Sequence, residues 1–131
     1  MSFTTIRRDI FNRFEANWVT TPIAYQNIPY KPSFNQPWVK INLFDESSSR
    51  INVGLPAIYR QVGTVIIEIH TEDAKGIQEG RGYGDTIAAI FRDQQFSGLT
   101  FSDVNVTAVG KNNGYWQTNV IAPFYWDGTY P

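Results

Sequence analysis

The sequence predicts an α+β fold, in which two α-helices pack on a mixed, mainly antiparallel β-sheet. Three observations predict this fold. Apolar residues recur at helical spacing near the N-terminus, two internal runs alternate as strands do, and Asn113-Gly114 joins two β-rich runs in the last third. The expected order is α-β-β-(β)-β-α-β-β, ending in a long C-terminal β-hairpin. A chain of 131 residues suits one domain, residues 1–131.

The first helix is expected over residues 4–18, where every fourth residue is apolar and charged residues lie off that stripe. The stripe consists of Ile6, Ile10, Phe14 and Trp18. Residues 20–22 then end the helix, and residues 23–25 predict a short strand. The proline-rich residues 27–37 are expected to form a surface loop or arm.

Residues 38–44 alternate between apolar and polar positions, which predicts a strand. The polar run Asp45-Glu-Ser-Ser-Ser49 is expected to break it. Residues 50–54 are a candidate returning strand, which Leu55-Pro56 interrupts. The strongest strand is expected over residues 59–71, centred on Val65-Ile-Ile-Glu-Ile-His70.

Residues 73–94 predict a second helix with a weak first half, because each of its four glycines costs about 1 kcal/mol relative to alanine. Gly76, Gly80 and Gly84 lie on one stripe of the helix at four-residue spacing. We expect the helix backbone to approach the sheet closely there, which would compensate for the cost of the glycines. Ser97-Gly98 is expected to end the helix and lead into the hairpin.

The hairpin around Asn113-Gly114 is apolar on both predicted faces. Asn-Gly supplies the positive φ angles of a tight turn. A hairpin in a monomeric sheet usually buries one face and exposes a polar face to water. Because neither face of this hairpin is polar, we expect both to be covered, by the helices or by another subunit. Trp116, Val120 and Phe124 are expected in the core. One face carries Thr107, Val109, Trp116, Thr118, Val120 and Phe124, and the other Val104, Val106, Tyr115, Gln117, Ile121 and Tyr125.

The composition excludes several classes of function. A formal charge of −1 disfavours specific nucleic-acid binding, and the lack of cysteine excludes thiol nucleophiles and thiolate zinc sites. The N-terminus has no signal-like apolar run and no stretch is long enough to span a bilayer, so a soluble protein made in the cytoplasm is expected.

Candidate catalytic groups are few. His70 lies near Glu68 and Glu72, but a metal or acid/base site needs more oriented partners, so an exposed strand-end histidine is the favoured interpretation. Gly80-Arg-Gly-Tyr-Gly84 does not have the spacing of a phosphate-binding loop. The sequence therefore predicts no enzyme, no cofactor and no metal.

Aromatic residues also occur where a core role is awkward, on the proline-rich loop and near the C-terminus. Aromatic side chains are enriched at the centres of protein interfaces. Packing of loops onto the domain explains them about equally well. The residues expected at a subunit or tube interface are Tyr30, Phe34, Arg50, Tyr59, Tyr115, Ile121, Tyr125 and Trp126.

Eight segments, in this order, resemble the tail terminator-like proteins of long-tailed bacteriophages (the minor tail protein U-like family). Each is a packing pattern and not a catalytic signature, and together they span nearly the whole chain. The glycine-rich start of the second helix departs from the family. The segments are Thr5-Ile-Arg-Arg8, Asn12-Arg-Phe-Glu-Ala-Asn-Trp18, Thr21-Pro-Ile-Ala-Tyr-Gln-Asn27, Pro37-Trp-Val-Lys-Ile41, Gly63-Thr-Val-Ile-Ile67, Asp85-Thr-Ile-Ala-Ala-Ile-Phe-Arg92, Gly98-Leu-Thr-Phe101 and Gly114-Tyr-Trp-Gln-Thr-Asn-Val120.

The resemblance implies a structural virion protein at the head-proximal end of the tail, assembled in the bacterial cytoplasm. It implies a homo-oligomeric ring, usually of six subunits, that contacts the tail tube protein and head-completion (connector) proteins. DNA would pass through the lumen without specific binding. In such a ring, the loop at 27–37 and the segment 45–57 are predicted to act as arms towards neighbouring subunits or the tube. Two alternatives remain open: another connector role, such as a head-completion or tail-tube protein, and a small ligand-binding or catalytic domain that uses His70.

Overall fold

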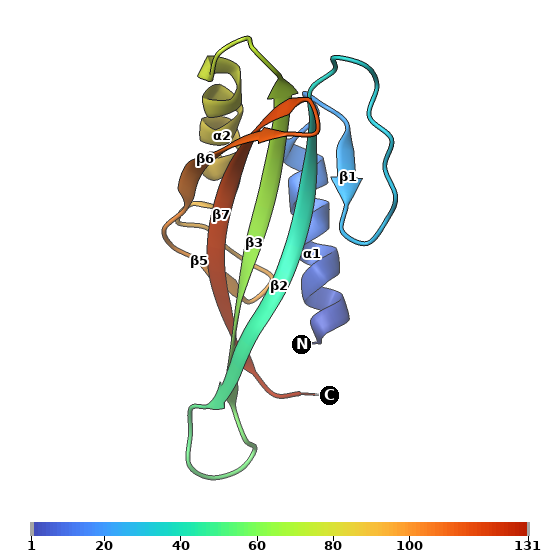
Figure 1. Ribbon diagram of the computed structural model, residues 1–131. Helices are drawn as coiled ribbons and strands as arrows, with labels where there is room; N and C mark the ends of the chain where they lie inside the picture. The colour runs from blue at the N-terminus through green and yellow to red at the C-terminus, as the bar shows by residue number, and fades with distance from the viewer. Residues whose placement is uncertain (1, 131) are drawn as a thin grey trace.

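The computed structural model describes residues 2–130, and its two helices lie on the same face of one twisted β-sheet (Figure 1). One strand pair, β1 with β2, is parallel and the others are antiparallel, which confirms the predicted α+β class. The elements are α1 (Phe3–Asn17), β1 (Ile23–Tyr25), β2 (Trp38–Arg50), β3 (Tyr59–Glu72), α2 (Gln78–Phe91), β4 (Gln95–Phe96), β5 (Leu99–Phe101), β6 (Asn105–Asn112) and β7 (Tyr115–Gly128).

Helix α1 follows the apolar stripe predicted for it and begins one residue earlier than expected. The Ser2 side chain accepts a hydrogen bond of 3.1 Å from the backbone N–H of Thr5, which caps the first turn. Ile6, Ile10 and Phe14 are buried against the sheet and α2. The helix ends where Trp18 takes an extended conformation.

Strand β2 continues through the polar run that was expected to end it. Residues 47–50 pair with residues 59–62 of β3, past an irregularity between Asp45 and Ser47. Both sides of β2 are exposed to solvent beyond Leu43, so no alternation marks this part as a strand. The expected returning strand at 50–54 is wrong, because residues 51–58 connect the two strands and β3 begins at Tyr59.

Helix α2 is shorter than the predicted 73–94. Gly76 has φ +83° and lies in the turn before the helix, and the chain leaves the helix after Phe91 to form the small β4–β5 hairpin. Close approach to the sheet is confirmed for Gly80 and Gly84. A Cβ atom there would lie 2.8 Å from Thr118 Oγ1 and 2.6 Å from Val106 Cγ1, respectively.

The C-terminal hairpin closes on Asn113-Gly114 as predicted, but its register differs. An irregularity between Ala108 and Gly110 shifts the pairing so that Val106 lies opposite Val120. Val106 therefore packs on the core, whereas Thr107 and Val109, which were expected on the Val120 face, are exposed. Of the three residues expected in the core, Val120 and Phe124 are buried, and Trp116 is partly buried.

The strand order β1-β2-β3-β7-β5-β4, with β6 also beside β7, places β3 and β7 in the middle of the sheet. Alternate residues of these strands, such as Val65, Ile67 and Val120, meet both helices in one hydrophobic core. The residues between them form the opposite face, here called the open face, which none of the described helices covers.

Candidate functional site

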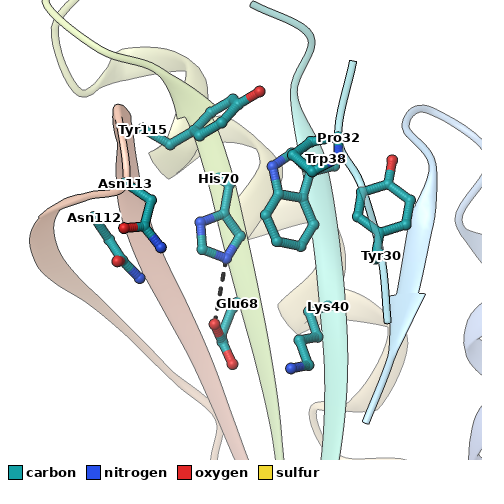
Figure 2. Close-up of a pocket in the computed structure, with 9 residues that line it drawn as sticks. All are labelled: Tyr30, Pro32, Trp38, Lys40, Glu68, His70, Asn112, Asn113 and Tyr115. Atoms are coloured by element: carbon teal, nitrogen blue, oxygen red, sulfur yellow. Dashed lines mark hydrogen bonds and ion pairs between the residues drawn. The ribbon is translucent and has the colours of Figure 1, made fainter. Parts of the chain in front are cut away.

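The open face carries a pocket of about 380 Å³ near the ends of β2 and β3 (Figure 2). The loop between β1 and β2 forms one wall, and the turn of the C-terminal hairpin forms another. Two cross-strand pairs of β2 and β3 lie between them, Trp38 with His70 and Lys40 with Glu68. The lining residues are Tyr30, Pro32, Trp38, Lys40, Glu68, His70, Asn112, Asn113 and Tyr115.

His70 lies inside this pocket and is only 3% exposed, in contrast to the exposed strand-end position expected for it. Its ring stacks on Trp38 with centroids 4.0 Å apart and planes within 10°, and the edge of Tyr115 approaches at 6.2 Å. Its Nε2 lies 3.3 Å from Glu68 Oε1. Within residues 2–130, no three His, Asp or Glu side chains gather as metal ligands. The histidine is therefore packed as part of the sheet surface.

Glu68 links three strands through hydrogen bonds. One carboxylate oxygen accepts from the Asn42 amide of β2 at 2.8 Å, and the other accepts from Gln117 of β7 at 3.5 Å. Its hydrogen bond with His70 holds the Glu68 pKa below its usual value against the opposing effect of burial, and Asn42 and Lys40 act in the same direction. The ionised carboxylate therefore stabilises the fold.

Replacing Glu68 by glutamine should make the stability of the protein less sensitive to acid. Because the folded pKa is lowered, the stabilisation is present above about pH 4.5 and is lost as the pH falls through the folded pKa. Urea unfolding at several pH values should show a deficit for Glu68→Gln at pH 7 that shrinks towards pH 3. Glu72→Gln is the control for removing a carboxylate from β3. A deficit that stays constant with pH would contradict this role.

The connection between β2 and β3 projects from the body of the molecule (Figure 1), and we call residues 51–58 the arm tip. Three aliphatic side chains point into solvent there: Val53 is fully exposed, Leu55 is 90% exposed and Ile51 is 47% exposed. Single exposed aliphatic residues are common on protein surfaces, but three within five residues of a projecting loop are typical of a contact site.

The arm tip is held in shape by its own polar groups. The Arg50 guanidinium donates to the backbone carbonyls of Asn52 (3.0 Å) and Gly54. The Asn52 amide donates to the Pro56 carbonyl at 3.0 Å and accepts from the Ile58 N–H at 2.7 Å. These bonds fix the loop before it meets any partner, which lowers the entropy cost of binding.

The structure gathers several of the expected interface residues at the two ends of the sheet. Tyr30 and Tyr115 line the pocket, where Tyr30 packs on Trp38 and the Tyr115 hydroxyl donates to the Ser33 carbonyl at 3.0 Å. That bond ties the loop at 27–37 to the sheet, while Phe34 is left 91% exposed.

The remaining expected interface residues lie towards the arm or along the open face. Arg50 lies at the base of the arm tip, and Tyr59 packs on Tyr130 beside it. Ile121 and Tyr125 are partly buried on the open face, where the Arg60 guanidinium lies 4.2 Å from the Tyr125 ring centroid. Trp126 is fully buried in the core, so its side chain is not part of the exposed surface of the subunit.

Segment 45–57 was expected to act as an arm, but Ile51, Val53 and Leu55 were not singled out within it, because residues 50–54 were interpreted as a strand. Gly54 and Pro56, which flank Leu55, were the available signal, since both are typical of a turn. The hydrophobic hollow described below was also missed. It depends on Trp116, which packs near residues 73–77, about forty positions earlier in the chain.

The fold and these surfaces define a small α+β domain with a projecting hairpin. The family model of the phage tail terminator protein matches residues 5–123, so the chain belongs to the phage tail terminator family. A solved structure shares this fold: at 17% identity it aligns with a TM-score of 0.62, over 95% of this chain and 97% of that chain. No curated protein matches the chain.

Membership of this family indicates a structural role in the phage tail, and the family itself is structural and not enzymatic. It also implies contacts with other tail and head proteins. Within residues 2–130, neither helix is both long and apolar enough to cross a bilayer.

Proposed function

We propose that the protein caps the head-proximal end of the phage tail tube as a ring. In this role it stops tube polymerisation and forms the joining surface for head-completion proteins. The observation that carries the proposal is the projecting arm tip with its exposed aliphatic side chains, on a chain of the tail terminator family. A surface of this kind suits a protein that is buried between neighbours in the virion.

The two ends and the open face supply different patches, as a ring requires. A ring is built from heterologous contacts, in which each subunit offers two unlike surfaces. The arm end carries Arg50 and Tyr59, and the pocket end carries Tyr30, Phe34 and Tyr115. We assign these two sets, with Ile121 and Tyr125 of the open face, to contacts with neighbouring subunits or the tube.

The charge of the chain fits a lumen that passes DNA. Affinity for phosphate grows with each lysine or arginine contact, and this chain has a formal charge of −1. We therefore expect DNA to pass through the ring without specific binding. We further propose that the ring contains six copies and is assembled in the host cytoplasm.

Phage that lack this protein should produce overlong tails, because nothing stops the tube at its proper length. Electron microscopy of lysates checks this, with the wild-type gene supplied in trans as the control. Particles with no tubes at all would assign the protein to the tube itself. Tails of normal length that fail to join heads would assign it to head completion.

A further inference from the structure

We propose that the arm tip of one subunit inserts into an apolar hollow at the opposite end of a second copy of this chain. This contact would be one of the joints of the ring, so it rests on the function proposed above. The argument depends on two features of the same chain, an exposed knob and a hollow of matching chemistry.

The hollow lies where β3 leads into α2 and has a volume of about 200 Å³. Ala74, Gly76, Ile77 and Trp116 line it, and Ile77 is 45% exposed. Among the described residues, the Trp116 indole N–H is buried without a hydrogen-bond partner. Asp73 and Lys111, 3.8 Å apart, form the charged part of its lining.

The arm tip matches this hollow in chemistry. Val53 and Leu55 are uncharged, aliphatic and exposed, and the Arg50 guanidinium beside them is engaged by backbone carbonyls. The fixed shape of the tip suits insertion as a rigid body.

The pocket on the open face is a poorer receptor for the same tip. It contains Lys40, Glu68 and buried His70, and an aliphatic side chain there would strip water from charged groups without replacing their hydrogen bonds. A membrane surface is also a poor partner, since Asp45 and Glu46 precede the tip and anionic lipids would repel them.

The positions of knob and hollow favour a chain of contacts between copies. The tip lies before the start of β3, and the hollow follows its other end, so the two are separated by the length of that strand (Figure 1). A contact between opposite ends is heterologous, and such contacts close into a ring when the rotation between subunits permits it. A reciprocal pair would instead stop at a dimer.

Engineered cysteines test the contact directly, because the native chain has no cysteine. Mixing Val53→Cys chains with Ile77→Cys chains under mild oxidation should give a disulfide-linked dimer. The double variant should give a ladder of linked species. Val109→Cys mixed with Val53→Cys is the control, because Val109 is an exposed valine on β6. Absence of the Val53–Ile77 link in a ring-sized assembly would overturn the inference and leave the ring intact.

The mass of the assembly separates the remaining outcomes. If the double variant links but stops at the mass of a dimer, the contact would be supported and the ring overturned. Leu55→Ala should weaken association about 10-fold or more, as expected for removing a buried aliphatic side chain. Its side chain is 90% exposed in the subunit, so the thermal midpoint of the subunit should not change. Association equal to that of Val109→Ala would count against the proposal.

Discussion

Replacing Trp126 by alanine should lower the free energy of unfolding by about 3–5 kcal/mol, the cost typical of removing a large core aromatic residue. Trp126 is fully buried on the core face of β7. The rings of Phe3 and Tyr130 meet it at centroid distances of 6.4 and 5.6 Å. Its removal would therefore loosen the start of α1 and the end of β7 together.

Urea unfolding followed by circular dichroism measures this loss. The matched control is Tyr125→Ala, one residue earlier on β7 but on the open face, where the ring is partly exposed and lies under Arg60. We expect this control to lose only about 1 kcal/mol from the cation–π contact, plus a contribution from its partly buried area. Equal losses for the two variants would mean that the helix-covered face is not the main core.

Gly63→Ala should destabilise the protein by about 1–3 kcal/mol, and Gly63→Val by more. A Cβ atom at Gly63 would lie 2.6 Å from Phe124 Cζ and 2.8 Å from the backbone oxygen of Phe44. Phe124 is only 2% exposed and the Phe44 oxygen belongs to the backbone, so neither can move away cheaply. The two central strands would have to shift against β2.

Gly82→Ala is the control for Gly63, and it should have the opposite sign. Gly82 lies within α2, and nothing lies within 4 Å of the position a Cβ atom would take. Alanine there should stabilise the helix by up to about 1 kcal/mol. Thermal unfolding of the two variants side by side gives the comparison, and a stable Gly63→Val protein would show that the packing at β3 is looser than described.

Much of the fold could be predicted because one-sided burial leaves a period in the sequence. Helix α1 has a stripe of four apolar residues, and residues 38–44 alternate, so both were located to within a residue at their start. The second half of β2 is exposed to solvent on both faces, so apolar and polar residues do not alternate there, and it was predicted as a break in the strand. The shift in pairing at Val109 has no signal in the sequence, because Val106 and Thr107 are equally suited to a strand in either register.

The candidate sites were less predictable, because they join residues from distant parts of the chain. His70 was expected to be exposed, but Trp38 and Tyr115 come from other strands and enclose it. Trp126 was expected at an interface from its place near the C-terminus, yet its strand parity puts it in the core. Spacing within one strand could have shown that parity, since Trp126 follows Val120 and Phe124 at even intervals.

The place of β7 in the sheet has a consequence for synthesis. Among the described residues this strand is the last in sequence, yet it lies between β3 on one side and β5 and β6 on the other. Until it leaves the ribosome, β3 has an unpaired edge and an apolar flank, Val65 to Ile69, open to other chains. The sheet can therefore close only after β7 has been synthesised, so chains truncated before Tyr115 should aggregate.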